Sequence, residues 1–263
     1  MAKGFSQVEG LDYDQVFSPV IRFKSVCLIL AMAALEGWVL TGLNVQNAYL
    51  YGKLDEEIYM EQPEGFIVPG KENMVLRLRR ALYGLKQAGL AWWQALKQSM
   101  EKLRFTSLSS DARLFLFRNK DSFIIAIIYV NDAIFCGPLP ALVNHLMKEF
   151  KIWETWDLGN VTEFLCMHIT QSSSKIHLDQ CAYLETVLQQ CGMQNAQSAA
   201  MPLLARYVPT LSVGASNLEI RSRFQTIIGS LLYLMLGTHP DIAFVVTTWN
   251  SSEAPPSCMC IPA

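Results

Sequence analysis

The sequence predicts an α+β fold in which an antiparallel sheet is backed by helices. Residues 123–137 contain two short apolar runs, rich in β-branched residues, on either side of an Asn-Asp pair. This pattern is typical of a tight β-hairpin inside a core. Residues 39–45 have the composition of a buried strand, and residues 87–103 carry a broad apolar face at helical spacing. The order of strand, helix and hairpin therefore favours a layer of strands covered by helices.

Length and composition narrow the functional classes. The chain has 263 residues, of which 51% are hydrophobic and 17% are charged, and its formal net charge is −2. That length can bury a full core, as one large domain or two small ones, and the composition excludes a disordered chain. The charge excludes a protein that binds nucleic acid through bulk charge, so any nucleic-acid contact needs a local basic face.

Seven cysteines lack the spacing of metal ligands, which is typical of reduced thiols in an intracellular protein. Residues 1–5 contain no apolar signal segment, and the longest apolar runs, residues 26–35 and 227–237, are too short to span a bilayer. We therefore expect an intracellular protein, cytoplasmic or nuclear, without membrane association. No feature of the sequence specifies an oligomeric state.

The first predicted helix begins near Ser25, which has the chemistry of an N-cap, and ends at Gly37. A buried strand at residues 38–45 leads into a short helical or turn segment at residues 46–52. We interpret the acidic residues 55–57 as a solvated face near a loop rather than as a metal site.

A predicted strand at residues 74–80 carries the only basic cluster of the chain. Arg77 and Arg79 alternate onto one face, Arg80 follows, and Lys86 comes shortly after the strand. The aromatic residues nearby are Tyr83, Trp92 and Trp93. Basic groups among aromatic rings suit a phosphate backbone with stacked bases, although an ordinary exposed strand face explains them equally well.

The remaining predicted elements alternate between strands and helices before the chain becomes mostly helical. At the tip of the central hairpin, Asn131-Asp132 is good turn chemistry by itself, but an Asp there can also face a cleft while the strands stay buried. The other elements are a strand at 114–117, a turn at 119–121, a helix at 141–150, a second hairpin around Ser172–Ser174, a helix at 182–191 ending at Gly192, a linker at 194–214, and a helix at 221–236.

Several sequence blocks carry a resemblance to a known family. They are Asp12-Tyr13, Phe17–Val20, Asn47–Gly52, Asp55–Phe66, Ala81–Ala88, Asp157–Gly159, Ile176–Leu178 and Ile228–Leu234. In this order they resemble the reverse transcriptase domain of copia-type LTR retrotransposons, which is a part of the Pol polyprotein. The resemblance extends from Gly4 to about Phe244 of this chain. So many blocks in one order make the resemblance specific.

The resemblance implies a right-hand polymerase fold with an antiparallel palm sheet, a primer-grip hairpin and a helical thumb. It implies fingers and palm at residues 1–171, a thumb or connection-like helical region at residues 172–248, and an unrelated tail at residues 249–263. By the same resemblance we expect the chain to lack a basic fingers strand at its start and the ribonuclease H region at its end.

The resemblance also implies a reaction, RNA-directed DNA polymerisation. The 3′-hydroxyl of a DNA primer on an RNA template attacks the α-phosphate of a deoxynucleotide, while two Mg²⁺ (or Mn²⁺) ions stabilise the attacking and leaving oxygens. Such cations need carboxylate oxygens, which the family supplies from the end of the first palm strand and from a Tyr-Val-Asp-Asp hairpin. Here Asn44 and Asn131 replace two of these Asp residues, and only Asp132 remains. We therefore expect a degenerate metal site, weak at best, and no polymerase activity.

Other family positions are partly altered and partly retained. The altered positions are Gly89-Leu90 in place of Pro-Arg, Gln46 in place of Lys, Cys166 in place of the primer-grip Gly, and His239 in place of Arg. The resemblance gives Tyr49 the role of excluding a ribose 2′-hydroxyl, and Lys86 and Gln87 keep the polar pair of the nucleotide-binding segment. A core position on a short helix explains Tyr49 equally well.

The sequence leaves three hypotheses open, and we favour the first. The first is a copia-type reverse transcriptase domain that is catalytically silent. The second is a nucleic-acid-binding module that uses the basic residues from Arg77 to Lys86. The third is a working polymerase that tolerates Asn44 and Asn131, or that recruits metal through Asp132 and Asp157.

Overall fold

The computed structural model describes residues 1–150, 153–172, 175–199, 201 and 218–250. The chain divides into two compact units. The first consists of Met1–Val161 with Ser173–Lys175, and the second of Thr162–Ser172 with Ile176–Ala263.

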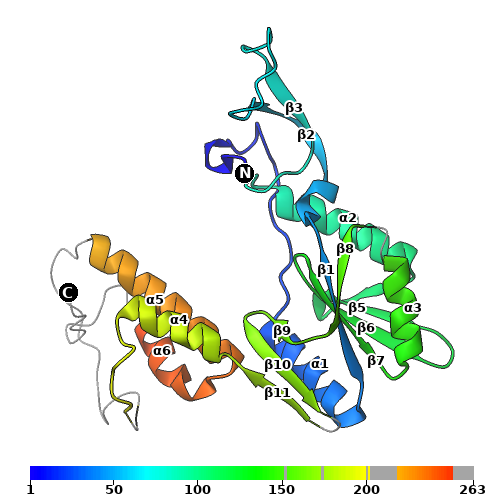
Figure 1. Ribbon diagram of the computed structural model, residues 1–263, viewed down its shortest axis with the longest axis vertical. Coiled ribbons are helices and arrows are strands. Elements are labelled where there is room, and N and C mark those ends of the chain that lie inside the picture. Colours follow the sequence, from blue (N-terminus) through cyan, green and yellow to red (C-terminus); the bar gives the residue numbers. More distant parts are fainter. Residues whose placement is uncertain (151–152, 173–174, 200, 202–217, 251–263) are drawn as a thin grey trace. The chain divides into compact units, whose positions relative to one another are not determined.

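The first unit is built on a six-stranded sheet in the order β4-β5-β6-β7-β1-β8, in which all neighbours are antiparallel (Figure 1). The strands are β1 (Val39–Val45), β4 (Thr106–Leu108), β5 (Asp111–Arg118), β6 (Phe123–Tyr129), β7 (Asp132–Gly137) and β8 (Thr155–Asn160). The predicted α+β class, an antiparallel sheet with helices, is confirmed.

Helices α2 (Ala88–Lys102) and α3 (Pro140–Phe150) lie against the same face of this sheet (Figure 1). Their apolar faces pack on alternate residues of the strands, as the side-chain periods of helix and strand require. Trp92, Phe135 and Phe150 are almost completely buried in this layer. The helix predicted at residues 87–103 therefore supplies one wall of the main core.

Helix α1 (Phe23–Glu36) begins earlier than predicted, and Ser25 is not its N-cap. Arg22 occupies the N-cap position without a side-chain cap, and the Ser25 hydroxyl donates instead to Asp111 Oδ2 at 2.7 Å. The Arg22 amide donates to the same oxygen at 3.0 Å. The Asp111 carboxylate on β5 thus accepts hydrogen bonds from donor groups at the start of the helix, a role that a neighbouring N-cap side chain usually has. Gly37 ends the helix in the left-handed conformation, as predicted.

A separate two-stranded sheet pairs β2 (Lys53–Glu61) with β3 (Val75–Arg80), after the short 3₁₀ helix η2 (Ala48–Tyr51). The acidic residues 55–57 therefore lie inside a strand, which corrects their expected place near a loop. Alternation along β2 leaves Asp55 and Glu57 exposed, while Ile58 is buried beside Ala88 and Ala91 of α2. The strand therefore exposes Asp55 and Glu57 to solvent and packs Ile58 against the helix.

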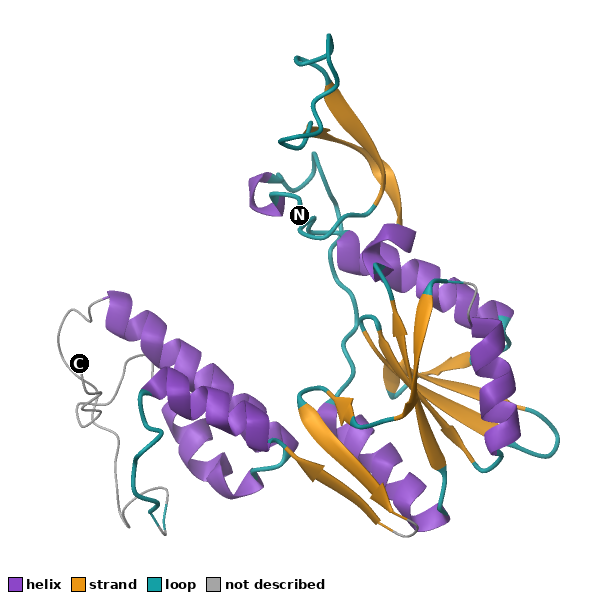
Figure 2. Cartoon of the chain, viewed as in Figure 1, coloured by secondary structure: helices purple, strands orange, loops and turns teal. Residues whose placement is uncertain are grey.

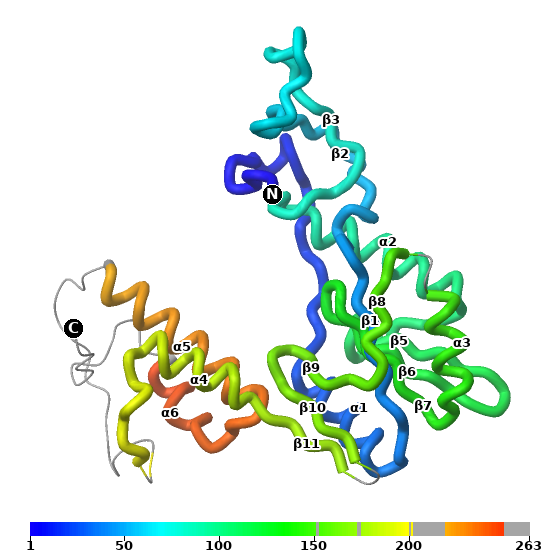
Figure 3. The backbone as a smooth tube through the Cα atoms, in the orientation of Figure 1, coloured from blue at the N-terminus to red at the C-terminus, as the bar shows by residue number. Residues whose placement is uncertain are grey.

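The N-terminal segment, with the 3₁₀ helix η1 (Gly4–Ser6), runs beside the loop that follows β3 (Figure 3). The Ala2 amide donates to the Tyr83 carbonyl at 2.7 Å. Gly84 has φ +101°, and a Cβ at this position would collide with the carbonyl of Ala2. Only glycine allows the two backbones to approach this closely.

The second unit combines a three-stranded sheet with helices (Figure 2). Its elements are β9 (Glu163–Phe164), β10 (Met167–Ser172), β11 (Lys175–Asp179), α4 (Cys181–Cys191), α5 (Leu218–Gly237), the 3₁₀ helix η3 (Pro240–Ile242) and α6 (Ala243–Asn250). The two strands of the predicted hairpin and the predicted helices are confirmed, whereas Ser173 and Ser174 of its turn lie outside the described residues. Gly192 ends α4 in the left-handed conformation. Most of the predicted linker and residues 251–263 of the predicted tail lie outside the described residues. No helix in the described ranges could span a lipid bilayer.

The turn between β9 and β10 stores backbone strain that a glycine would relieve. Leu165 and Cys166 have φ values of 53° and 51°, the left-handed region that costs a residue with a Cβ roughly 1 kcal/mol. We expect Cys166→Gly to raise the free energy of unfolding of the second unit by about 0.5–1 kcal/mol, because relief of strain exceeds the added freedom of the unfolded chain. Urea denaturation followed by circular dichroism measures the change. Cys166→Ala keeps the Cβ and should leave the free energy of unfolding unchanged. A rise equal to that of Cys166→Gly would show that backbone strain is not the cause.

Candidate active site

The candidate site lies where β1, β6 and β7 end beside one another. Asn44 on β1 pairs with Asp132 on β7, and Asp132 pairs in turn with Tyr129 on β6. Residues directly paired across antiparallel strands project from the same face of the sheet. The three side chains therefore share one face, and each is partly buried.

The Asp132 carboxylate is held by a side chain on the strand that faces it. Asn44 Nδ2 donates a hydrogen bond to Asp132 Oδ1 at 2.5 Å. An amide facing a carboxylate makes an attractive pair in which the carboxylate oxygen is already used as an acceptor. The site thus presents one negative charge, and one of its two oxygens is bonded to an amide.

The hairpin tip is shifted by one residue from the predicted Asn-Asp turn. Strand β6 ends at Tyr129 and β7 begins at Asp132, so that Val130 and Asn131 form the turn. Val130 has φ +52°, which is rare for a β-branched residue. Two bonds hold this turn: Trp92 Nε1 donates to the Val130 carbonyl at 2.6 Å, and the Val45 amide donates to the Asn131 carbonyl at 2.8 Å.

The donor groups at this site do not suit a pair of magnesium ions. Magnesium binds through charged oxygens, and here one carboxylate stands beside two neutral amides. Across the described parts of the chain, no group of three or more His, Cys, Asp and Glu side chains is arranged to hold a metal ion. Asp157 does not supply the missing charge, because it pairs with Leu43 and so projects from the opposite face to Asn44.

Tyr49 lies on η2, half-buried, and lines a cavity of about 150 Å³. Its ring contacts that of Tyr83, with centroids 4.4 Å apart. Burial raises the pKa of the Tyr49 hydroxyl, and Tyr83 adds to the shift. The cavity is also bounded by Tyr129 and Val130, so that Tyr49 adjoins the hairpin that carries Asp132.

Lys86 and Gln87 have different surroundings. Lys86 is exposed, with its ammonium group 5.4 Å from the centre of the Tyr13 ring. Gln87 is buried, and both ends of its amide are bonded: Nε2 donates to the Asp12 carbonyl at 2.9 Å, and Oε1 accepts from Gln7 Nε2 at 3.0 Å. Lys86 is free to meet a ligand, whereas Gln87 holds the N-terminal segment.

The three arginines of β3 do not form a uniform basic face. Arg77 makes an exposed ion pair with Glu57 at 2.7 Å, and Arg80 Nη1 donates to the Tyr51 carbonyl at 3.0 Å. Arg79 is exposed. An exposed ion pair is weak, but it cancels charge locally. The structure therefore reduces the positive charge that the sequence pattern indicated.

Sequence reasoning missed Asp111 and Arg113, two buried charged residues on β5. Arg113 Nε donates to the Pro19 carbonyl at 2.6 Å and Nη2 donates to Ser18 Oγ at 2.8 Å, while the guanidinium lies 4.4 Å from the centre of the Trp93 ring. The only signal in the sequence was an Asp and an Arg two positions apart, at the start of an apolar strand. Their partners are distant in the chain.

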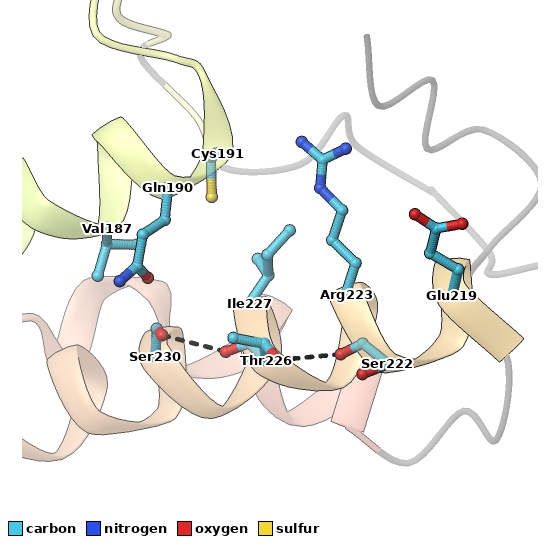
Figure 4. Close-up of a pocket in the computed structure, with 9 residues that line it drawn as sticks. All are labelled: Val187, Gln190, Cys191, Glu219, Ser222, Arg223, Thr226, Ile227 and Ser230. Atoms are coloured by element: carbon cyan, nitrogen blue, oxygen red, sulfur yellow. Dashed lines mark hydrogen bonds between the residues drawn. The ribbon is translucent and has the colours of Figure 1, made fainter. Parts of the chain in front are cut away.

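Two other hollows lie among the described residues. One, of about 420 Å³, lies in the first unit and is lined by Asp14, Gln15, Lys53, Asp55, Glu56, Gln87, Leu90, Ala91 and Gln94. The other, of about 380 Å³, lies between α4 and α5 in the second unit (Figure 4). There Arg223 and Glu219 extend from α5, while Thr226 and Ser230 donate to carbonyls one turn earlier.

Comparison with known proteins places the chain in a family. Residues 1–205 match the model of the family described as reverse transcriptase (RNA-dependent DNA polymerase). The chain is 36% identical over 255 residues to the retrovirus-related Pol polyprotein from transposon TNT 1-94 of Nicotiana tabacum, covering 94% of this chain and 19% of the relative. It is 35% identical over 250 residues to the corresponding polyprotein from transposon RE2 of Arabidopsis thaliana, covering 94% and 17%.

A shorter relative also matches. The chain is 28% identical over 207 residues to a putative transposon Ty5-1 protein of Saccharomyces cerevisiae, covering 78% of this chain and 67% of the relative. The chain spans less than a fifth of the two plant polyproteins. The matched residues 1–205 include the strands that carry Asn44 and Asp132. The chain belongs to the reverse transcriptase (RNA-dependent DNA polymerase) family, as a domain of the copia type found in transposon Pol polyproteins.

Proposed function

We propose that this chain is the polymerase region of a copia-type Pol polyprotein whose nucleotidyl-transfer centre is silent. In this proposal residues 1–171 form the fingers and palm, residues 172–248 form the thumb or connection-like region, and residues 249–263 are an unrelated tail. The antiparallel sheet with α2 and α3 on one face supports a palm, and the helices α4 and α5, which lie within residues 172–248, support a thumb.

The hydrogen bond from Asn44 to Asp132 carries the proposal. Two metal ions at this place would need several negative oxygens, and each lost carboxylate removes an attraction to a dication. A cation that approached Asp132 would also have to displace the Asn44 amide from its oxygen. Asn131 lies in the adjacent turn and offers only a neutral carbonyl. The proposed centre therefore lacks the charge that holds Mg²⁺ or Mn²⁺ in the family.

The proposed partners are those that the family name implies, an RNA template and a DNA primer. Tyr49 lines the cavity beside the proposed nucleotide site, and Gln87 holds the N-terminal segment. Lys86, which is exposed, remains a proposed nucleotide contact. Arg77, Arg79 and Arg80 remain the proposed nucleic-acid contacts. The Arg77–Glu57 ion pair favours the silent polymerase over the alternative, a module that binds nucleic acid mainly through this strand.

Primer extension on an RNA template, with Mg²⁺ or Mn²⁺, tests the proposal. We expect the unmodified chain to add no nucleotide. We also expect it not to bind Mn²⁺ at micromolar protein concentration, so that the electron paramagnetic resonance spectrum remains that of the free ion. Metal-dependent extension would overturn the silent site. Tight, salt-sensitive binding of primer–template that Arg79→Met abolishes, without extension, would favour the binding module instead.

A further inference from the structure

Arg113 places a positive charge inside the first unit without a complete set of partners. Its side chain is only 3% exposed. Nε and Nη2 each donate to the segment before α1, but Nη1 is buried and finds no hydrogen-bond partner among the described residues. Buried donors are almost always paired in folded proteins, so an unpaired nitrogen on a buried cation requires an explanation.

No carboxylate in the described part of the chain forms an ion pair with this guanidinium. Asp111 is the nearest candidate in the sequence, but its oxygens accept hydrogen bonds from the Arg22 amide, the Ser25 hydroxyl and the Arg113 amide. Burial lowers the pKa of the Arg113 guanidinium to about 10, whereas the interactions with Tyr49 and Asp111 raise this pKa. The group therefore remains charged at neutral pH, although an unpaired buried charge is costly.

Arg113 lines the cavity of about 150 Å³ that Tyr49 and Tyr129 also line. Its other walls are Ser18, Pro19, Val20, Ile21, Gly89, Trp92 and Val130. This volume is below the ~300–1,000 Å³ typical of pockets for whole drug-sized ligands, so it suits one chemical group. Because Tyr129 pairs with Asp132, the cavity adjoins the candidate site. Among the residues lining it, Arg113 carries the only charged side chain.

We propose that this cavity is an anion subsite in which Arg113 Nη1 binds a phosphoryl group of a nucleotide without a divalent cation. The N–H groups of Nη1 on a charged guanidinium suit phosphate oxygens, and such charge-assisted bonds are stronger when desolvated. The two lost carboxylates also remove repulsion that a polyphosphate would otherwise meet at Asn44 and Asn131. The inference rests on the proposed function, because the occupant is the nucleotide of the same site.

Binding of dTTP in excess EDTA, measured by calorimetry on the full chain, tests this proposal. We expect binding to the unmodified chain, and at least tenfold weaker binding to Arg113→Met. Arg118→Met is the matched control, because Arg118 is an exposed residue at the end of the same strand and should change affinity less than twofold. Binding of inorganic pyrophosphate and of phosphate is measured in the same way. Comparison with dTTP shows whether the cavity takes free phosphate or the phosphoryl group of a nucleotide.

A second variant covers the case in which Arg113→Met fails to fold. Gly89 lines the cavity from the first turn of α2, where an added Cβ meets only Ser18 at ordinary contact distance, 3.6 Å. Gly89→Leu should therefore fill the cavity and weaken dTTP binding at least tenfold, with no loss of thermal stability. No binding of dTTP, pyrophosphate or phosphate by the unmodified chain would overturn the subsite, as would unchanged binding by a folded Arg113→Met. Neither result depends on primer extension, which tests the silent centre separately.

Discussion

The Asn44→Asp/Asn131→Asp double variant is expected to extend a primer at least ~10⁴-fold faster than the unmodified chain, in a strictly metal-dependent way. Each restored carboxylate faces a dication, an attraction of about 8 kcal/mol at ~4 Å and an effective dielectric of ~20. Discounted to about 3 kcal/mol each for solvent and relaxation, the pair contributes about 6 kcal/mol, and each 1.4 kcal/mol is about tenfold in rate. Single-turnover extension on an RNA template with Mg²⁺ measures the gain.

The single variants are the controls for this prediction. Groups that act as a unit in catalysis are strongly non-additive, so Asn44→Asp or Asn131→Asp alone should recover less than a tenth of the gain. Binding of Mn²⁺ should appear with the double variant only. A folded double variant that binds Mn²⁺ and still does not extend primers would contradict the carboxylate explanation. The cause of silence would then lie in the other altered positions, such as Cys166 or Gly89.

Trp92→Ala is expected to lower the free energy of unfolding of the first unit by about 4 kcal/mol. Trp92 is 1% exposed, and large-to-small changes of buried aromatic residues typically cost about 3–5 kcal/mol. The variant also leaves the Val130 carbonyl without the indole donor that holds the turn. Urea denaturation followed by far-ultraviolet circular dichroism measures the loss.

Two further variants separate packing from hydrogen bonding at Trp92. Trp92→Phe keeps most of the buried apolar area and loses the indole donor, so its expected cost is about 1–2 kcal/mol. Trp156 is 62% exposed on β8, and Trp156→Ala should cost less than ~0.5 kcal/mol. An equal loss from Trp92→Ala and Trp156→Ala would show that the α2 layer is not the main core of the unit.

The central elements were predictable because their patterns are local. Residues 87–103 repeat apolar side chains at helical spacing, and the helix observed, Ala88–Lys102, matches within one residue at each end. The hairpin was found for the same reason, but its turn was placed one residue late. Val130 has no local preference for a positive φ, and the turn is fixed by Trp92 and Val45, which are distant in the sequence.

The candidate site was less predictable, because its character depends on contacts between distant residues. The sequence names Asn44 and Asp132 but does not indicate that they are bonded across β1 and β7. The partner of Ser25 is likewise not a nearby backbone amide but Asp111, 86 residues away. Arg113 was missed because an arginine in a short strand usually lies at the surface, and only the assembled fold shows that it is buried.

Under the proposed loss of two aspartates, the bond between Asn44 and Asp132 sets an order on the two substitutions. Two carboxylates on directly facing strand positions repel each other unless a cation lies between them, whereas an amide and a carboxylate attract. On the proposed function, an Asn at position 44 therefore makes the fold more stable than an Asp would, and Asn44→Asp alone sacrifices that stability without returning activity. Recovery of polymerase activity would therefore require both substitutions together, because the first one alone lowers stability without a gain in activity.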